Sequence, residues 1–413
     1  MANVPFSNQY SWIRENTIRL GNLTQPRLVP EVIVSLNRLI NKFEHKKVII
    51  DFEEVTSVYP FPLIPIVGYI EYFKTVMNVE FEYVNVEGYL KHINISEPLK
   101  ANIIDKNFTG SSLDRIWSFR NSTDISTLTT AIIKDLRRSH LCQDGVLDAI
   151  KWGINEVMDN VIQHSQTDVG FVMAQAQKGM KTINVCIFDY GRGIYKSLKG
   201  SEYNPRSAID AISMAVKEGV TRDRSVGLGN GLWGLFNMVS LNDGSLIIIS
   251  GNGGIDFHNQ GQESTTLKDI VLLNKYNQAT TLNFRLNLEK PISIVQALNG
   301  QDVTDLYIDN LYDDYNRIVY PINSIASGTG TRESAKEIQN EVMNIFFRER
   351  KKITLDFAEV GIITSSFADE LICKLIDQYG FIQFQMMFEI TNMNKEVRGI
   401  VEKALKQRLG TGS

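Results

Sequence analysis

The sequence predicts a protein of the α/β (α+β) class, and three observations support this prediction. Short apolar strands alternate with helices of apolar spacing, which is typical of a sheet faced by helices. One such unit occurs twice, near the beginning and near the end of the chain. Between the two copies, a long amphipathic helix is followed by strands that end in glycine-containing turns. We therefore expect two copies of one α/β domain that flank a third domain of another kind.

Length, composition and charge define the broad class of the protein. The chain has 413 residues, which is enough for two or three domains, and its 43% hydrophobic and 22% charged residues are typical of a globular protein. The net charge of -4 gives no overall attraction to nucleic acid or to an anionic membrane. We expect neither of them as a partner.

The cysteines and the N-terminus indicate a cytoplasmic protein. The first residues are polar and do not resemble a signal peptide. The three cysteines, Cys142, Cys186 and Cys373, are far apart and fit neither a disulfide framework nor a metal cluster.

An internal repeat divides the chain. Residues 46–55 read KKVIIDFEEV and residues 351–360 read KKITLDFAEV, so that six of ten positions are identical. The similarity resumes with FEYVN at 81–85 and FEITN at 388–392, offset by two further residues. Similarity at two places that are nearly in register indicates a duplicated domain. We expect domains at residues 1–100, 101–290 and 291–413.

Each copy has the same predicted order of elements, namely helix, strand, loop, helix, strand and a short terminal helix. In the first copy, the helices are expected at 32–43 and 64–73 and the strands at 48–52 and 79–84. In the second copy, the helices are expected at 335–347 and 367–379 and the strands at 353–357 and 385–390.

The copies differ in the loop between the first strand and the second helix. The second copy carries Thr364, Ser365 and Ser366 there, whereas the first copy has Tyr59 followed by a proline-rich segment without a hydroxyl at the serine positions. Serines at the start of a helix serve first of all as N-caps, and this structural role is the first interpretation.

The second copy resembles STAS-like domains, the family related to anti-sigma-factor antagonists. The resemblance depends on Leu355-Asp356-Phe357, on Val360 and on the run TSSFADE at 364–370. It implies that Ser366 accepts phosphate from a partner kinase, although Thr364 replaces the usual Asp and Phe367 the usual Gly. The first copy is a weaker match and has no acceptor hydroxyl at this place.

The central domain begins with a predicted helix at 148–164. Glu156, Asn160 and His164 follow one another at intervals of four residues and therefore line one face of the helix. An Asn can ligate Mg²⁺ without adding charge, and a Glu can take a proton from an attacking water or hydroxyl. A solvated polar helix face would show the same pattern.

Three glycine- or threonine-containing segments follow this helix. The apolar strand 183–188 leads into Asp189-Tyr190-Gly191-Arg192-Gly193, where a flat base could approach the backbone and donate to the carboxylate. Gly227, Gly229 and Gly231 precede an apolar helix that continues to about residue 239, and the N–H groups of such a start attract an anion. Thr280 stands at the beginning of a strand. Read singly, these segments are also compatible with a tight turn or with a hinge that binds no ligand.

The order of these segments resembles the signature of the GHKL superfamily, which includes gyrase-type ATPases, heat-shock chaperones, MutL-like proteins and histidine and anti-sigma kinases. Residues 155–160 resemble its N box, 189–193 its first glycine box and 227–231 its second, while Thr280 resembles the threonine of the last box. Ala279 stands where that box usually has a glycine. The resemblance covers about residues 117–288 and implies an α/β sandwich with a mixed sheet, helices on one face, and ATP with Mg²⁺ between the helices and a lid.

The resemblance also implies a role for each site residue. Glu156 would be the general base, Asn160 the Mg²⁺ ligand and Asp189 the reader of adenine. The remaining expected nucleotide-binding residues lie in the glycine boxes, at the start of the following helix and in the last box: Gly191, Gly193, Gly227, Gly229, Gly231, Leu232 and Thr280.

Other features narrow the class of protein. No helix with a phosphoacceptor histidine is evident, which argues against a sensor histidine kinase, and no P-loop lysine motif is present. His164 follows the Glu156–Asn160 pair and is expected to pack or to support the site indirectly. The polar segment 196–226 is expected to form the lid, in which Lys217, Arg222 or Arg224 either reaches the γ-phosphate or is merely solvated.

Three functions follow as alternatives. The first is an ATPase that acts as a nucleotide-driven switch for partner proteins bound through its STAS-like domains. The second is a protein serine kinase of the anti-sigma type that acts on Ser366 or on a partner's serine, and the third is a module that binds ATP without hydrolysing it. The resemblance further suggests a bacterial stress or phage-defence system and a homodimer that forms on ATP.

Overall fold

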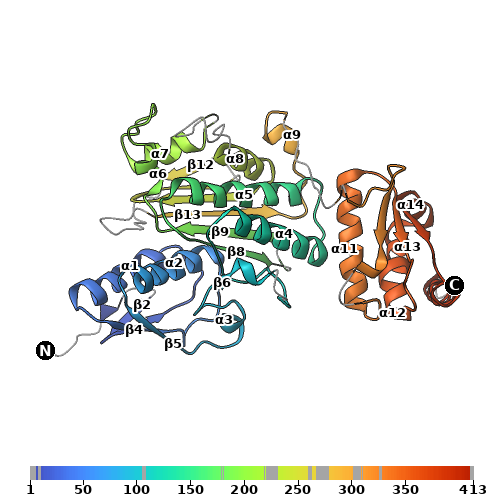
Figure 1. Ribbon diagram of the computed structural model, residues 1–413, viewed down its shortest axis with the longest axis horizontal. Helices are drawn as coiled ribbons and strands as arrows, with labels where there is room; N and C mark the ends of the chain where they lie inside the picture. Colours follow the sequence, from blue (N-terminus) through green and yellow to red (C-terminus); the bar gives the residue numbers. More distant parts are fainter. Residues whose placement is uncertain are drawn as a thin grey trace. The chain divides into compact units, whose positions relative to one another are not determined.

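The computed structural model confirms an α+β protein, and two of the three sheets in its described residues are mixed (Figure 1). It describes residues 6–7, 11–104, 108–177, 179, 181–217, 219, 231–258, 263–266, 279–300, 308, 310–324 and 328–409. The chain forms two compact units. The first unit comprises residues 1–133, 149–287 and 292–301, and the second comprises 134–148, 288–291 and 302–413. The three domain boundaries expected from the sequence remain a prediction.

The first unit begins with a five-stranded sheet of order β1-β2-β3-β4-β5. Its last three strands run parallel, and β1 to β3 are antiparallel. The strands are β1 (Phe6–Ser7), β2 (Ser11–Arg14), β3 (Thr17–Leu20), β4 (Lys47–Asp51) and β5 (Glu80–Val84). The accompanying helices are α1 (Leu28–Asn37), the π-helical turn η1 (Arg38–Lys42), α2 (Pro60–Val76) and α3 (Gly88–His92).

An eight-stranded sheet of order β12-β11-β10-β13-β9-β8-β7-β6 forms the rest of the first unit. All neighbouring strands are antiparallel except β6 and β7, so the sheet is mixed. The strands are β6 (Leu99–Lys100), β7 (Trp117–Phe119), β8 (Gly170–Gln177), β9 (Thr182–Asp189), β10 (Ser245–Ser250), β11 (Gly253–His258), β12 (Glu263–Thr266) and β13 (Thr280–Asn287). The helices are η2 (Ala101–Ile103), α4 (Ser122–Ser139), α5 (Val146–His164), α6 (Gly193–Leu198), α7 (Ala208–Ala215), α8 (Gly231–Leu241) and α9 (Ile294–Ala297).

Helices α5 and α8 cover one face of the eight-stranded sheet (Figure 1). Gly153 of α5 lies against Phe284 of β13 and against Leu235 of α8. Side chains alternate between the faces of a strand, so Thr280, four residues before Phe284 on β13, lies on this same face. Thr280, one of the residues expected to bind nucleotide, therefore shares a face with α5.

Helix α2 of the N-terminal part covers the opposite face of this sheet. Tyr69 packs against Phe188 of β9 with ring centroids 5.3 Å apart. The buried side chains of the N-terminal part form one hydrophobic core with Phe171, Met173, Cys186 and Phe188 of the sheet. The sheet is thus sandwiched between α5 and α8 on one side and α2 on the other.

The second unit contains a three-stranded parallel sheet of order β14-β15-β16. Its strands are β14 (Ile318–Pro321), β15 (Ile353–Asp356) and β16 (Phe388–Thr391). The helices are η3 (Ile322–Ser324), α11 (Arg332–Glu349), α12 (Ser365–Ala368), the π-helical turn η4 (Asp369–Cys373), α13 (Lys374–Tyr379), α14 (Phe381–Met387) and α15 (Lys395–Leu409).

The duplication predicted from the sequence is visible in matching hydrogen bonds. Oδ1 of Asp51 accepts from Nδ2 of Asn85 at 2.7 Å, and Oδ1 of Asp356 accepts from Nδ2 of Asn392 at 2.7 Å. In both copies the same oxygen also accepts from the backbone N–H two residues later, at 3.0 Å. The strands pair in the same register as well: Val48 with Phe81, and Ile353 with Phe388.

The second copy differs from the expected element order near its end. The strand expected at 385–390 begins only at Phe388, because residues 381–387 form α14. Phe384 and Met387 are both buried, and their spacing of three places them on one face of a helix rather than of a strand. The terminal helix α15 is 15 residues long and not short. Within the described residues, no helix has the length and apolar character needed to cross a bilayer.

Candidate functional site

Helix α5 places Glu156 and Asn160 on one face, one turn apart. Both side chains are half-buried. Burial raises the pKa of Glu156, and the nearby Asp159 carboxylate raises it further. A carboxylate with a raised pKa is a stronger base than an exposed Glu, which suits a proton acceptor.

The start of α8 lies directly against Glu156. A β carbon added to Gly231, the first residue of α8, would overlap Oε2 of Glu156. Only the absence of a side chain at this position lets the helix start and the carboxylate approach so closely. The half-buried Leu232 follows in the first turn. The partial positive charge of the α8 N-terminus therefore lies beside the proposed base.

Asp189, Thr280 and Ser250 form a row across three adjacent strands. Thr280 of β13 pairs with Asp189 of β9 on one side and with Ser250 of β10 on the other. Directly paired residues of antiparallel strands project from the same face of a sheet. All three side chains therefore lie on the α5 face, at the end of the sheet where these strands begin or end.

The Asp189 carboxylate is buried, with 4% of the residue exposed. Burial raises its pKa to about 7, although the backbone N–H of Gly191 donates to Oδ1 at 2.8 Å and opposes this shift. A buried carboxylate with an open lone pair is a strong acceptor for a ligand N–H group.

Hydrogen bonds connect the turn from Asp189 to Gly193 to its neighbours on both sides. The carbonyl of Gly191 accepts from the N–H of Ala279 at 3.0 Å, just before β13. Nε of Arg192 donates to the carbonyl of His164 at 2.7 Å, at the end of α5. Gly193 has a φ of 73° and begins α6. The turn therefore holds a fixed position between α5 and β13.

Ala279 occupies the position at which the resembled family has a glycine. Its φ is 36°, in the left-handed region that favours glycine, and the residue is fully buried. The backbone thus has a conformation that glycine favours, although the residue here is alanine.

Ser250 was not among the residues predicted from the sequence. Its Oγ accepts from the N–H of Ile194 at 2.9 Å, donates to the carbonyl of Ala279 at 3.2 Å and lies 3.1 Å from Oγ1 of Thr280. The available signal was a serine that ends the apolar run SLIIIS immediately before GNGG.

Several predicted residues lie outside the described residues. They include Gly227 and Gly229 of the expected phosphate loop and Arg222 and Arg224 of the expected lid. The part of the expected lid that the structure describes contains the second half of α6 and all of α7. Lys217 follows α7 and is exposed. Among the residues described, no group of three or more His, Cys, Asp or Glu side chains could hold a metal ion.

The loop before α12 carries the predicted phosphoacceptor. Thr364 is the N-cap of α12, since its Oγ1 accepts from the N–H of Phe367 at 3.2 Å, so the interpretation of the two serines as N-caps is wrong. Extended backbone at Thr364 places its own hydroxyl over the free N–H groups. Ser365 is exposed, and Oγ of the half-buried Ser366 lies 3.0 Å from Oγ1 of Thr364.

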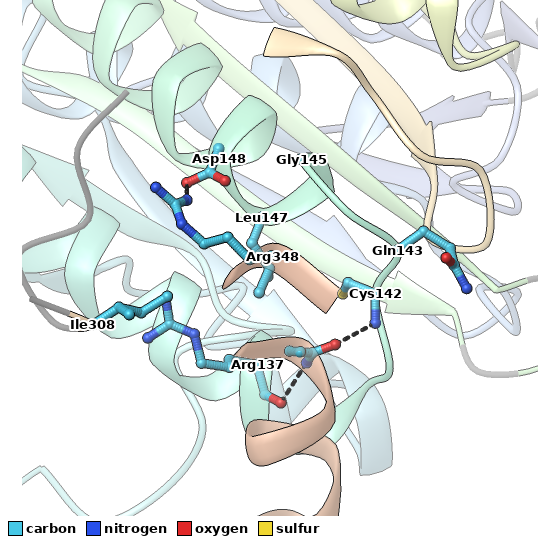
Figure 2. Close-up of a pocket in the computed structure, with 9 residues that line it drawn as sticks. Arg137, Cys142, Gln143, Gly145, Leu147, Asp148, Ile308 and Arg348 are labelled. Carbon is cyan, nitrogen blue, oxygen red and sulfur yellow. Dashed lines mark hydrogen bonds and ion pairs between the residues drawn. The ribbon is translucent and has the colours of Figure 1, made fainter. Parts of the chain in front are cut away.

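The second unit has a small pocket of its own (Figure 2). Arg348 of α11 forms an ion pair with Asp148. Asn344 of α11 accepts from the N–H of Cys142 at 2.7 Å and donates to the carbonyl of Arg137 at 2.9 Å. Because Arg137 lies in the last turn of α4, this contact satisfies a carbonyl at the end of that helix. The ion pair and these hydrogen bonds thus connect α11 to residues 134–148.

Comparison with known proteins identifies one matched family. Residues 334–398 match a STAS-like domain of unknown function (DUF4325), which confirms the STAS-like prediction for this part of the chain. No curated protein matches the chain.

Comparison with solved structures finds similarity to the following three, among others. The 43K ATPase domain of Thermus thermophilus gyrase B, in complex with an aminocoumarin, is 13% identical, with 39% of this chain and 38% of that chain covered and a TM-score of 0.20. The ATP binding domain of Francisella tularensis topoisomerase IV, in complex with a small-molecule inhibitor, is 14% identical, with 48% and 47% covered and a TM-score of 0.22. Full-length ShkA in complex with AMPPNP is 8% identical, with 92% and 72% covered and a TM-score of 0.21. The chain covers less than half of the first two structures, 38% and 47% of their lengths.

Proposed function

We propose that the first unit binds Mg-ATP and hydrolyses it. The observation that supports this function best is the gathering of unlike groups on one face of the eight-stranded sheet. A half-buried carboxylate (Glu156) lies against a helix N-terminus (Gly231), and a buried acceptor (Asp189) lies at the end of a strand on the same face. This combination suits a ligand with an anionic part and a part that donates hydrogen bonds.

Each end of the nucleotide has a matching group. Asp189 would accept a hydrogen bond from the exocyclic amine of adenine, with Thr280 beside it. The N-terminus of α8 would face the phosphates, and the carboxamide oxygen of Asn160 would hold Mg²⁺ together with phosphate oxygens. When bound, Mg²⁺ would offset the negative charge of the phosphates. The oxygen donors of α5 fit this ion.

Glu156 would act as the general base in hydrolysis. Its carboxylate takes a proton from a water molecule while the water oxygen forms a bond to the γ-phosphorus. The bond from that phosphorus to the β–γ bridging oxygen breaks, and ADP leaves with the electron pair. Burial and Asp159 raise the pKa of Glu156, which increases its basicity.

Substitution of Glu156 tests this role. Glu156→Gln keeps the shape of the side chain but removes the base, so ATP binding should persist while phosphate release falls at least about tenfold. Asp168→Asn, an exposed carboxylate just beyond α5, is the matched control and should leave the rate unchanged. An unaltered rate in Glu156→Gln would remove this residue from the mechanism. ATP binding without any phosphate release by the natural protein would instead support a non-hydrolysing module.

We further propose that the nucleotide cycle drives a switch for partner proteins that bind the STAS-like domains, in a bacterial stress or phage-defence system. Dimerisation on ATP belongs to the same proposal. Size measurement in solution with and without a non-hydrolysable ATP analogue tests it, because an unchanged mass would exclude a nucleotide-dependent homodimer.

A serine kinase is the second candidate, and one observation favours it. Ser365 is exposed, and Ser366 is half-buried with its hydroxyl beside Thr364 at the start of a helix, where added negative charge is stabilised. Mass spectrometry after incubation with Mg-ATP should then find phosphate on Ser366. A loop that stays unmodified, with inorganic phosphate as the product, favours the ATPase.

A further inference from the structure

Helix α2 of the first copy lies against the strand that leads into the glycine turn. Tyr69 of α2 packs on Phe188, the residue before Asp189, with ring centroids 5.3 Å apart. A β carbon at Gly68 would overlap the same ring, so the backbone of α2 approaches β9 closely. Burial raises the pKa of the Tyr69 phenol, and the nearby Asp189 carboxylate raises it further. The first copy is therefore close to the end of β9 at which Asp189 lies, although it covers the other face of the sheet.

Tyr190 continues this contact beyond the end of the strand. Its ring centroid lies 5.4 Å from that of Tyr72 on α2 and 6.4 Å from that of Phe171 on β8. Both partners are buried, and both belong to the hydrophobic core of the first copy. Phe188 and Tyr190 thus flank Asp189 and contact α2. The carboxylate between them projects towards α5, in keeping with the alternation of side chains along a strand.

The turn from Asp189 to Gly193 has three side chains, and each of them has a different attachment. Asp189 accepts from the N–H of Gly191 within the turn, at 2.8 Å. Arg192 donates to a carbonyl at the end of α5, at 2.7 Å. Tyr190 connects the turn to the first copy. Without its ring, the turn would keep the hydrogen bonds to α5 but lose this packing on α2.

We propose that Tyr72 is a positioning residue for the nucleotide site: its packing on Tyr190 keeps the Asp189 turn in place, so that the first copy contributes to ATP affinity. This inference rests on the proposed function as a nucleotide site. It concerns the support of the turn from outside the site, because α2 covers the face of the sheet opposite to α5.

The size of the effect follows from how a poorly held turn binds. A turn that samples other positions binds ligand only while it is correctly placed, so the apparent affinity falls by the fraction of time spent there. An aromatic pair shifts an equilibrium by about twofold to tenfold beyond the burial of its area. The contribution of the Tyr72–Tyr190 pair is expected in this range.

The test measures the affinity of the full chain for ATP by calorimetric titration in the presence of Mg²⁺. Tyr72→Leu keeps an apolar side chain in the core but removes the ring, so the dissociation constant should rise about threefold to tenfold. Phe52→Leu is the matched control, because Phe52 is also buried in the core of the first copy but stacks on Tyr83 of β5, with centroids 6.4 Å apart. It should lower stability and leave the ATP affinity unchanged.

The kinetics of hydrolysis separate positioning from a merely structural role. Tyr72→Leu leaves Glu156 on α5 untouched, so KM for ATP should rise while kcat stays within about twofold of that of the natural protein. A general loss of folded protein would instead lower kcat and leave KM unchanged. That result, or an equal loss of ATP affinity in Phe52→Leu, would overturn the proposal.

Tyr190→Leu tests the same contact from the side of the turn. It should weaken ATP binding at least as much as Tyr72→Leu, and the double variant should bind no more weakly than Tyr190→Leu alone, because both changes remove one contact. Fully additive losses would show that the two rings act independently and would contradict the proposal. If Tyr72→Leu does not fold, an unchanged ATP affinity in Tyr190→Leu, at a half-buried position, overturns it.

The outcomes separate this inference from the nucleotide site itself. Magnesium-dependent ATP binding by the natural protein together with unchanged affinities in Tyr72→Leu and Tyr190→Leu overturns the inference alone. Absence of any magnesium-dependent binding of ATP to the natural protein overturns the proposed function and the inference together.

Discussion

Gly231 and Glu156 are in such close contact that any side chain at position 231 would overlap the Glu156 carboxylate. One residue begins α8 and the other lies in the middle of α5. The contact couples the position of the proposed base to that of the helix start that would face the phosphates. A change at either residue is therefore expected to affect both.

Gly231→Ala tests this coupling. The added methyl group must displace Glu156 or the first turn of α8, so phosphate release should fall at least about tenfold, since small misplacements of reacting groups cost as much. Steady-state phosphate release measures this effect, and ATP binding is measured in parallel to show that the nucleotide still binds. Gly399→Ala, a helical glycine of α15 with open space around it, is the control. A fully active Gly231→Ala protein would show that the contact has no catalytic role.

The buried Asp189 predicts that ATP affinity depends on pH. The adenine amine needs an ionised acceptor, and the pKa of Asp189 in the free protein is raised to about 7 by burial. Below this pH the carboxyl is protonated, and the affinity should fall by up to about tenfold per pH unit. Titrations from pH 5.5 to pH 8.5 measure this dependence. Asp189→Asn should bind weakly at every pH, and a flat profile in the natural protein would contradict the assignment.

The same group predicts how stability without nucleotide depends on pH. The pKa of Asp189 is higher in the folded than in the unfolded chain, so the carboxyl favours folding at low pH, and this contribution is lost as pH rises through about 7. Asp189→Asn removes the penalty, and its gain in unfolding free energy should be larger at pH 8 than at pH 5, by at most about 3 kcal/mol. Urea unfolding at both values checks the sign. A gain confined to pH 5 would be inconsistent with a raised pKa.

The contact between α2 and the sheet predicts a loss of stability in Gly68→Ala. A β carbon at Gly68 would overlap the ring of Phe188 on β9. The ring is buried and cannot move away freely, so overpacking should cost about 1–3 kcal/mol of unfolding free energy. Denaturant titration of the full chain measures it. Gly361→Ala, which has open space, serves as control, and equal stability of the two variants would argue against close packing of α2.

Asn344 predicts a stability defect confined to the second unit. Asn344→Ala leaves the N–H of Cys142 and the carbonyls of Arg137 and His140 without this partner. Buried groups that lose a hydrogen bond cost about 1–3 kcal/mol each, so unfolding of the second unit should shift clearly to lower denaturant. Hydrogen exchange at residues 134–148 localises the effect. Gln383→Ala, at an exposed position of α14, should have no such consequence.

Much of the fold could be predicted from the sequence because its signals are local. The spacing of Glu156 and Asn160 already places them on one helix face. The repeat predicts a duplicated domain, and the two copies form matching hydrogen bonds at Asp51 and Asp356. The family match and the mixed sheets confirm the STAS-like second copy and the α+β class.

The remaining features depend on contacts between distant segments. Ser250 is 30 residues from Thr280 in sequence, and only the pairing of β10 with β13 brings them together. The short apolar run before Phe388 is compatible with strand or helix, and packing of Phe384 and Met387 decides for a helix. The burial of α2 under the sheet likewise depends on packing between distant segments, and no local sequence pattern predicts it.

The two copies of the duplicated domain differ in how far the start of the second helix is buried. The helix start that offers hydroxyls in the second copy corresponds in the first to Pro60, Phe61 and Pro62, all of which are buried. The first turn of α2 in the first copy is therefore packed inside the first unit, whereas the corresponding helix start in the second copy carries the exposed Ser365. The phosphoacceptor proposed at Ser366 has no counterpart at this helix start in the first copy, so a kinase that acts on the chain at this position is expected to modify the C-terminal copy.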